Sequence, residues 1–332
     1  MIPPLSVALI GYGYAGRVFH APLAAAVPGL SLQRIVSSRA DAVHADWPGV
    51  RVSATVDEAL SDADIDLVVI ATPNELHASQ AHAALDAGKH VVVDKPFTVT
   101  VAEAEAVCQH AERAGRVLSV FHNRRWDGDF RTVRALIDSG ALGDVRYFES
   151  HFDRFRPQVR DRWRERIGPG AGLWFDLGPH LLDQSLQLFG PPREITVDRA
   201  VLRDGAQVDD YFHATLRYDT RRVVLHATML APAHDLRFVV HGTQGSYVKE
   251  GLDTQEDALK AGAKPGGFRW GEDPRTGLLT TWHDGETSTR PVPNEPGNYL
   301  RFYEGVRDAI TIGGVNPASG DDGLAVMRLL LR

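Results

Sequence analysis

Short apolar runs alternate with helical patterns over roughly the first 120 residues of the chain. Apolar positions at helical spacing extend from about Ala15 to Ala26, Glu75 to Ala87 and Val101 to Ala114. This alternation predicts βαβ units, and hence an α/β fold with a doubly wound parallel sheet. The expected strands are Val7 to Ile10, Leu32 to Val36, Leu67 to Ala71, Val91 to Val93 and Val117 to Phe121.

The last of these helices has clear start and stop signals. Thr100 and Glu103 have the spacing of a capping box, and Gly115 stands where the apolar pattern stops. Cys108, the single cysteine of the chain, falls on the apolar face of this helix. We therefore expect a packed and unreactive thiol.

The pattern changes after Phe121. A helix is predicted from Phe130 to Ser139, and the following strands alternate apolar and polar residues, which is typical of an antiparallel sheet with one buried face. The segment from Gly251 to Pro296 is rich in Gly, Pro and Asp and predicts little regular structure. The expected strands are Val145 to Phe155, Ile195 to Val201, Tyr211 to Tyr218, Val223 to Thr228 and Leu236 to Val240.

This change of pattern predicts two domains, residues 1–121 and residues 122–332. The first would bind a dinucleotide, and the second would bind the substrate and carry an open, mostly antiparallel sheet. An amphipathic pattern from Asp322 to Arg332 predicts a terminal helix, which we expect to pack back on the first domain.

Charge and cysteine content limit the class of protein. The 332 residues include 36 basic and 43 acidic side chains, a net charge of −7, which argues against a nucleic-acid partner or an anionic membrane. One cysteine excludes an internal disulfide and a multi-thiolate metal site, and no metal ligand set is expected. No apolar stretch approaches the length of a membrane span, so a cytoplasmic location is expected.

A glycine motif follows the first strand directly and opens the first helix. It reads Gly11-Tyr12-Gly13-Tyr14-Ala15-Gly16. Glycines at these positions let the backbone approach a pyrophosphate, and the helix N-terminus supplies amide donors. Because the strand, the helix and the βαβ alternation surround it, we interpret the motif as a dinucleotide site rather than a structural turn. Its candidate cofactor residues are Gly11, Gly13, Tyr14, Ala15 and Gly16.

The end of the second strand bears on the choice of cofactor. An NAD site would place a carboxylate near Ser37, where this chain has Ser37, Ser38 and Arg39. Small hydroxyls and a guanidinium suit a 2′-phosphate, so NADP(H) is expected in preference to NAD(H). In the alternative, Arg39 only caps a surface turn and Asp41 contacts the ribose.

Two loops follow the next strands at the edge where a doubly wound sheet binds ligand. One contains Thr72, Pro73 and Asn74 and leads to His77; the other is Asp94-Lys95-Pro96. All seven are candidate cofactor contacts. Asn74 could instead cap the following helix. Asp94 and Lys95 could form an ordinary surface ion pair, but a lysine at a buried strand end is either paired or placed for chemistry.

The stretch Asp176-Leu177-Gly178-Pro179-His180-Leu181-Leu182-Asp183 carries the second group of candidates. Pro179 suits the first turn of a helix that runs to about Phe189. Spacing of i, i+4 can bring Asp176 near His180, and a histidine beside a carboxylate can act as a general base. A structural capping role is equally open, whereas zinc binding lacks a third ligand.

Together these motifs resemble the Gfo/Idh/MocA oxidoreductases, and the resemblance covers nearly the whole chain. Their order is GYGYAG, ATPN, DKP and DLGPHLLD. Longer stretches look like the NADP-dependent scyllo-inositol dehydrogenase branch: FHNRRWDGDF (Phe121 to Phe130), RWRE (Arg162 to Glu165), DLGPHLLDQ and TQEDALKAGAKP (Thr254 to Pro265).

The resemblance implies an N-terminal Rossmann domain and a C-terminal α/β domain whose large open sheet commonly serves oligomerisation. The family's catalytic lysine matches Lys95, and its aspartate and histidine match Asp176 and His180. This chain reads DKP where EKP is commoner, so Asp94 is one methylene shorter than the usual glutamate.

From these observations we expect the protein to be an NADP(H)-dependent dehydrogenase that acts on a secondary alcohol of a cyclic polyol such as scyllo-inositol. Lys95, Asp176 and His180 are the expected catalytic residues, and they should also contact substrate. Asn123 is a candidate for both cofactor and substrate contact, and Asp153 and Trp163 are further substrate candidates. A homodimer or homotetramer through the C-terminal sheet is expected.

Three alternative functions stay open from the sequence. One is a sugar dehydrogenase or reductase of the same family. Another is an enzyme in which transient oxidation enables glycoside cleavage, or in which one sugar is oxidised as another is reduced. The last is a non-catalytic NADP-binding sensor. Intact Lys95, Asp176 and His180 argue against a sensor.

Overall fold

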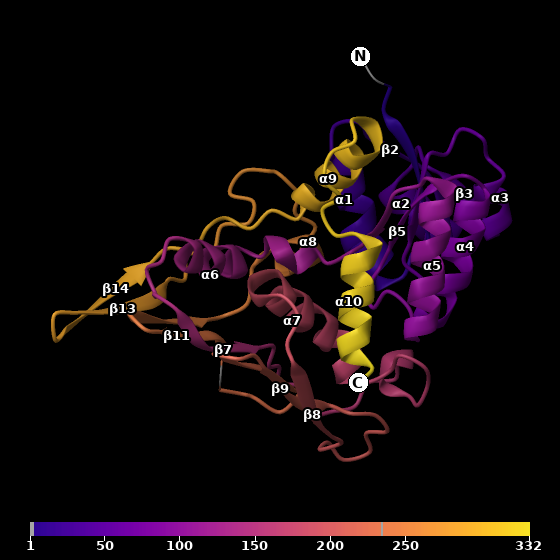
Figure 1. Cartoon of the computed structure of the whole chain (residues 1–332). Helices are drawn as coiled ribbons and strands as arrows, with labels where there is room; N and C mark the ends of the chain where they lie inside the picture. The colour runs from indigo at the N-terminus through magenta and orange to yellow at the C-terminus, as the bar shows by residue number, and fades with distance from the viewer. Residues whose placement is uncertain (1–2, 234) are drawn as a thin grey trace. The chain divides into compact units, whose positions relative to one another are not determined.

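The computed structural model describes residues 3–233 and 235–332, and it contains two compact units (Figure 1). The first unit comprises the chain up to Asn123 together with residues 255–270 and 298–331. The second comprises residues 124–254 and 271–297, with Arg332. Two segments therefore return to the first unit after the boundary expected between residues 121 and 122.

A six-stranded parallel sheet forms the centre of the first unit, as predicted. Its strand order, β3-β2-β1-β4-β5-β6, reverses between β1 and β4, which is the doubly wound Rossmann arrangement. The central strands are buried on both faces because helices cover them, and Val7, Val68 and Val91 have no exposed surface. The strands are β1 (Leu5–Ile10), β2 (Leu30–Val36), β3 (Arg51–Ser53), β4 (Leu67–Ile70), β5 (His90–Val93) and β6 (Leu118–Val120).

The helices of this unit lie where they are predicted, but the sequence predicts no element for the region between β2 and β4. The stretch that holds β3 also contains two short helices; a three-residue strand is too short to show a periodicity. The capping box of α5 is confirmed: the Glu103 amide donates to Thr100 Oγ1 at 3.1 Å, and the Thr100 amide donates to Glu103 Oε2 at 3.0 Å. The segments are a π-helical turn (Gly16–His20), α1 (Ala21–Ala26), α2 (Ala40–Asp46), α3 (Val56–Leu60), a 3₁₀ turn (Asn74–Leu76), α4 (His77–Asp86) and α5 (Val101–Ala114).

The returning segments supply α8 (Gln255–Lys260), α9 (Leu300–Thr311) and α10 (Gly320–Leu330). The terminal helix α10 packs against α5 and β6, and the Asn316 side-chain amide donates to the Leu118 carbonyl at 2.9 Å. Cys108 lies beside α10, and burial raises the pKa of its thiol to about 11. The thiol is therefore protonated at neutral pH, as expected for a packed cysteine.

An eight-stranded sheet forms the second unit, in the order β14-β13-β12-β11-β7-β10-β9-β8. All neighbouring strands are antiparallel except β7 and β10, which run parallel. The strands are β7 (Val145–His151), β8 (Glu194–Ala200), β9 (Tyr211–Arg217), β10 (Arg222–Thr228), β11 (Leu236–Gly242), β12 (Gly245–Glu250), β13 (Gly277–His283) and β14 (Glu286–Val292).

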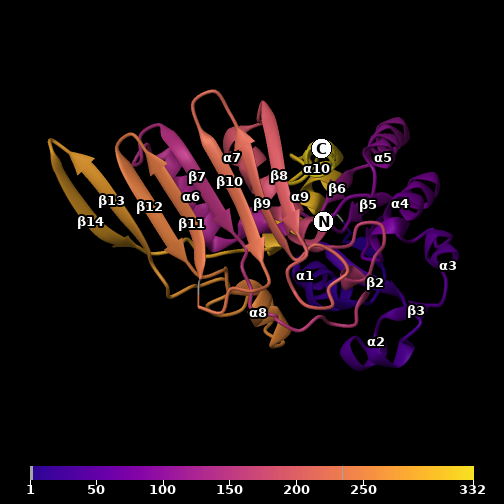
Figure 2. The same ribbon diagram turned by 90° about the horizontal axis from the view of Figure 1, so that it is seen from below.

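Helices α6 (Gly128–Asp138) and α7 (Leu173–Phe189) lie on one face of this sheet (Figure 2). On β9, Phe212, Ala214 and Leu216 are fully buried on that face, so the predicted alternation is confirmed. The buried guanidinium of Arg237 connects the layers. It donates to Asp129 of α6 at 2.9 Å and to the side-chain oxygen of Gln184 on α7 at 2.9 Å.

Two sequence predictions are wrong. The segment from Gly251 to Pro296 has more regular structure than expected, because it contains α8 in the first unit and a hairpin of β13 and β14 in the second. The hairpin was missed because β14, at the sheet edge, consists mainly of exposed polar residues and has no buried face to impose an alternation. In addition, α7 begins at Leu173, so Pro179 lies inside the helix rather than in its first turn.

Among the described helices, none is both long enough and apolar enough to cross a membrane.

Candidate active site

The glycine loop after β1 has a shape that suits a dinucleotide. Gly11 adopts a φ of +97°, and a Cβ there would lie 2.5 Å from the Ala71 carbonyl oxygen. A Cβ on Gly16 would lie 2.1 Å from the Gly11 carbonyl oxygen, so this glycine allows close packing of helix on strand. A Cβ on Gly13 would meet no atom within 4 Å. The open side of Gly13 is thus where a pyrophosphate can approach the backbone.

Two tyrosines and an ion pair hold this loop in place. The Tyr12 hydroxyl donates to Asp46 at 2.6 Å, and Arg17 binds the same carboxylate at 2.7 Å. Tyr14 is half exposed and donates to Glu256 of the returning segment at 3.0 Å. Ala15 directly precedes the π-helical turn that starts at Gly16. The loop is therefore fixed by contacts within the first unit.

Arg39 lies beside the glycine loop. Its guanidinium donates to the Tyr12 carbonyl, and its amide donates to Ser37 Oγ at 3.0 Å. Ser38 and Arg39 are exposed, and Asp41 stands in the first turn of α2. The structure therefore brings Ser37, Ser38 and Arg39 to the edge of the loop that would receive the adenosine ribose.

His77 joins the loops that follow β4 and β5. Its Nδ1 lies 2.9 Å from the Pro96 carbonyl oxygen and its Nε2 lies 3.0 Å from the Thr72 carbonyl oxygen. Burial, partly offset by Asp94, lowers the pKa of His77. His77 thus holds together the two loops that sequence analysis assigned to the cofactor. Pro73 precedes the 3₁₀ turn and Asn74, which is buried, begins it.

Asp94 is buried at the end of β5, where it belongs to a chain of polar groups that the sequence did not indicate. Its Oδ1 lies 3.4 Å from His20 Nε2, and His20 Nδ1 lies 2.6 Å from the Tyr303 hydroxyl. Burial alone would raise the pKa of Asp94, but His20, Lys95 and His77 lower it to about 2. Asp94 is therefore ionised beside the half-buried Lys95, and the shorter DKP side chain has its own partner in His20.

The second unit positions Asp176 and His180 one turn apart on α7. His180 is buried, and its ring lies nearly parallel to that of Phe152 at a centroid distance of 6.5 Å. Asp176 lies 3.9 Å from Arg154 and 3.7 Å from Arg164. Asp183, the other acid of this stretch, forms a two-pronged ion pair with Arg125 at 2.6 and 2.9 Å. Asp176 is thus the acid of α7 that faces a group of arginines.

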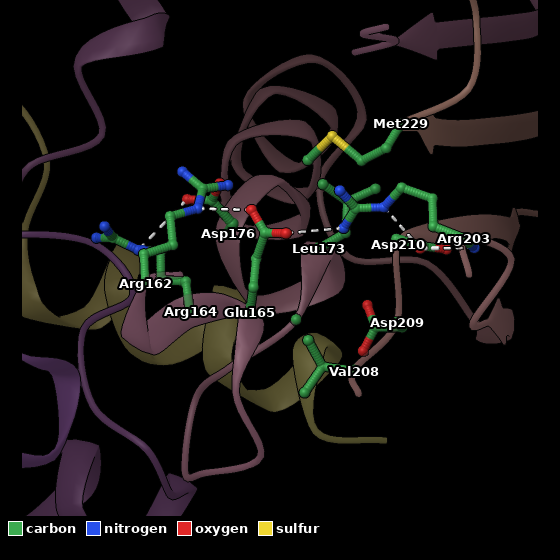
Figure 3. Close-up of a pocket in the computed structure, with 11 residues that line it drawn as sticks. Arg162, Arg164, Glu165, Leu173, Asp176, Arg203, Val208, Asp209, Asp210 and Met229 are labelled. Carbon is green, nitrogen blue, oxygen red and sulfur yellow. Dashed lines mark hydrogen bonds and ion pairs between the residues drawn. The ribbon is translucent and has the colours of Figure 1, made fainter. Parts of the chain in front are cut away.

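A small pocket adjoins Asp176 (Figure 3). Glu165 anchors its wall, accepting from Arg162 at 2.7 Å and from the buried Arg203 at 3.1 Å. These bonds secure the turn Trp163–Glu165, on which Trp163 is partly exposed and is covered by the Arg164 guanidinium at 4.5 Å. The candidate substrate residue Trp163 therefore stands close to the arginine that contacts Asp176.

Asp153 lies on the face of the eight-stranded sheet opposite α7. Backbone alternation beyond β7 directs Phe152 and Arg154 toward α7 and directs Asp153 to the opposite side, where it bonds to His151 and His226 at 3.0 and 2.9 Å. The face that carries His151 and Asp153 is therefore the one opposite α7 and His180, and a substrate contact of Asp153 stays a prediction. Burial disfavours the charged form of His151, but Asp153 and Glu149 outweigh this effect and raise its pKa to about 9.

Asn123 is buried at the last position of the first unit. It begins a 3₁₀ turn that extends to Trp126.

Comparison with known proteins decides the family. Residues 5–122 match the NAD-binding Rossmann-fold model of the Gfo/Idh/MocA oxidoreductase family, and residues 134–331 match the model of its C-terminal alpha/beta domain. The chain belongs to this family. It is thus an NAD(P)-dependent oxidoreductase, and the resemblance and fold class inferred from its motifs are confirmed.

Several relatives align over nearly the whole chain. The uncharacterized oxidoreductase YdgJ of Escherichia coli is 55% identical, with 98% of this chain and 94% of the relative covered. The scyllo-inositol 2-dehydrogenase (NADP(+)) IolW of Bacillus subtilis is 38% identical, with 99% and 92% covered. A solved Yersinia pestis structure superposes with a TM-score of 0.96 at 52% identity, with 100% of this chain and 94% of that chain covered.

Proposed function

We propose that this protein is an NADP(H)-dependent dehydrogenase that transfers hydride between nicotinamide and a secondary alcohol or ketone of a cyclic polyol, scyllo-inositol or a related inositol. The observation that carries this proposal is the 38% identity over 99% of the chain to a relative named as an NADP-dependent scyllo-inositol 2-dehydrogenase. The residues Lys95, Asp176 and His180 support it, since they offer an ammonium, a carboxylate and an imidazole for alcohol oxidation.

The guanidinium of Arg39, an exposed residue, supports NADP(H) over NAD(H). It lies at the edge of the glycine loop, beside Ser37, where a 2′-phosphate can pair with it and adenine can stack on it. Gly11, Gly13 and Gly16 would hold the pyrophosphate, and the loops containing Thr72, Pro73, Asn74 and Pro96 would line the nicotinamide end.

The cofactor, when bound, would supply the hydride acceptor. In the proposed reaction His180 accepts the proton of the substrate hydroxyl, and Asp176 orients the imidazole. Lys95 donates a hydrogen bond to the same oxygen and stabilises its developing negative charge. Asp94, ionised at the preceding position, places a negative charge next to Lys95. Asn123 and Trp163 would contact the other hydroxyls of the substrate.

Substitution of the lysine tests this mechanism. Lys95→Met should lower kcat by about 10² to 10⁴, because it removes a charged donor at the reacting oxygen. Its affinity for NADPH, measured by fluorescence titration, should stay within a few-fold of wild type. Undiminished turnover would remove Lys95 from the mechanism.

A polyol panel tests the substrate. Inositols, pyranose sugars and the corresponding ketones are offered in both directions while NADPH absorbance is followed. Turnover of inositols above sugars supports the proposal, whereas preference for a sugar would favour the role named for a more distant relative, the 1,5-anhydro-D-fructose reductase of Ensifer adhaerens. A product mixture formed without net cofactor consumption would indicate an internal redox reaction instead.

The cofactor preference has its own test. Ser37→Asp combined with Arg39→Leu should lower the ratio of kcat/KM for NADPH to that for NADH by about tenfold or more, because it exchanges a phosphate-binding cation for a ribose-binding carboxylate. Arg113→Leu, which removes an exposed arginine of α5, is the matched control and should leave the ratio unchanged.

We also propose that the second unit mediates a homodimer or homotetramer through its large sheet. Trp282 of β13 is 57% exposed and Leu278 is 52% exposed, which leaves apolar surface available near one edge of the sheet. Light scattering coupled to gel filtration would measure the mass. A monomer at micromolar concentration would contradict this proposal.

A further inference from the structure

The sheet face opposite α7 carries a cluster of histidines and carboxylates. Glu149 and His151 alternate outward on β7, and Asp153 continues the same alternation just beyond the strand. In the parallel pairing of β7 with β10, His226 stands beside His151. The four side chains thus come from two neighbouring strands and lie together on one face.

One carboxylate lies between the two imidazoles. Asp153 Oδ2 lies 3.0 Å from His151 Nδ1, and Asp153 Oδ1 lies 2.9 Å from His226 Nδ1. The group is shielded from solvent, because the side-chain exposures of His151, Asp153 and His226 are 10%, 5% and 17%. Each residue offers one ligand atom, and these three atoms lie within 4.8 Å of one another.

This geometry is close to that of a metal site. Four-coordinate zinc holds its ligand atoms at about 2.0 to 2.2 Å, which places them roughly 3.4 Å apart. Small side-chain rotations would bring the three atoms to that spacing. Two imidazoles and one carboxylate favour zinc, cobalt or nickel over magnesium and calcium, which prefer oxygen ligands alone.

Glu149 contacts the ring nitrogen of His151 that would not bind the metal, as carboxylates commonly do around metal sites. Its Oε1 lies 2.6 Å from His151 Nε2. In the metal-bound state Nε2 would carry the proton and donate it to Glu149, and Nδ1 would present its lone pair to the ion beside the Asp153 carboxylate. A carboxylate that orients a ligating histidine in this way is characteristic of metal centres.

Binding of a metal ion would displace the proton of His151, because a ligating imidazole is neutral. The divalent ion would then take the place of that proton beside the Glu149 and Asp153 carboxylates. We propose that His151, Asp153 and His226 form a site for a divalent transition-metal ion of the zinc class, with Glu149 as the residue that positions His151. The ion would join β7 to β10, and a water molecule would complete its coordination.

Metal titration of the full-length protein tests the proposal. Protein treated with a chelator and then dialysed is titrated with Zn²⁺ and with Co²⁺ at neutral pH by calorimetry. We expect one ion per chain with a Kd in the micromolar range or below, and a tetrahedral Co²⁺ absorption spectrum. No binding would show that protonated histidines balance the cluster, and would overturn the proposal.

Variants locate the site. His226→Gln should weaken Zn²⁺ binding by about 100-fold or more, and Glu149→Gln should weaken it by about 10- to 100-fold. Glu149→Gln keeps the size of the side chain, so it remains informative if His226→Gln does not fold. Circular dichroism and NADPH titration report the integrity of each variant independently of metal.

A second histidine pair provides a stringent control. His82 Nδ1 lies 2.8 Å from His110 Nδ1 between α4 and α5. The double variant His82→Gln/His110→Gln should bind Zn²⁺ like wild type, as should His241→Gln on β11. Loss of binding in either control, or unchanged binding in both His226→Gln and Glu149→Gln, would place the metal elsewhere and refute the proposal. The dehydrogenase proposal is unaffected by any of these outcomes.

Discussion

His20 and Asp94 lie 3.4 Å apart in the buried interior of the first unit, and Asp94 directly precedes Lys95, the proposed catalytic lysine. The pairing is tertiary: His20 comes from the π-helical turn after the glycine loop, and Asp94 comes from the end of β5. It keeps Asp94 ionised, and through Asp94 it contributes to the electrostatic environment of Lys95.

The depressed pKa of Asp94 predicts a pH-dependent stability. Its value of about 2, against 3.8 for the ordinary carboxyl, corresponds to about 2 kcal/mol of folding free energy. Because its pKa is lower in the folded state, the Asp94 carboxylate stabilises that state at pH values above the unfolded-state pKa. This contribution is lost as the pH falls through the folded-state pKa. The free energy of unfolding of wild type should therefore exceed that of Asp94→Asn at pH 7, and the difference should shrink by about 2 kcal/mol between pH 5 and pH 2.

Urea unfolding at a series of pH values measures this difference. Asp41→Asn, at an exposed position of α2, is the control for removal of a carboxylate from the surface. A gap between wild type and Asp94→Asn that stays constant down to pH 2 would show that the folded state does not stabilise the Asp94 carboxylate.

The glycine loop predicts opposite behaviour for two similar substitutions. Gly13→Ala should fold as wild type, since its Cβ meets no atom within 4 Å, but the methyl group would occupy the approach of the pyrophosphate. We expect its Kd for NADPH to rise about tenfold or more. Gly16→Ala should lower the melting temperature instead, because its Cβ would lie 2.1 Å from the Gly11 carbonyl oxygen. Thermal unfolding and NADPH titration of both variants distinguish these effects, and equal affinity of Gly13→Ala and wild type would contradict the assignment.

The buried pair of Arg237 and Asp129 predicts a large loss of stability when one partner is removed. Both side chains have no exposed surface. Arg237→Met would leave the Asp129 carboxylate buried without its guanidinium, at a cost of about 3 to 5 kcal/mol. The double variant Arg237→Met/Asp129→Leu should recover much of this loss. Denaturant unfolding measures both, and a double variant no more stable than Arg237→Met would refute the interpretation.

The pocket beside Asp176 predicts a selective effect on substrate. Glu165→Gln would weaken the ion pairs with Arg162 and Arg203 that secure the turn carrying Trp163 and Arg164. We expect KM for the polyol to rise about tenfold while the Kd for NADPH stays unchanged, because the glycine loop belongs to the other unit. Glu194→Gln, at an exposed ion pair of β8, is the matched control. A parallel loss of cofactor affinity would contradict this role.

Local patterns in the sequence determined a large part of the fold. The apolar runs predicted five strands of the parallel sheet, and the alternation on β9 predicted its buried face. The capping box at Thr100 placed the start of α5. These features depend on residues a few positions apart, so the sequence displays them directly. Where a strand is very short, as in β3, or exposed, as in β14, that signal is lost.

Tertiary structure alone decided the partners of the charged residues. Nothing near Asp94 in the sequence indicates His20 or Tyr303, and nothing near Asp176 indicates Arg164 as its neighbour. The alternation of β7 placed His151 and Asp153 on one face, but it could not tell whether that face would be the one covered by α7. The packing of a helix on a sheet is set by the fit of buried surfaces from distant segments, and that fit left this pair beside His226 instead of His180.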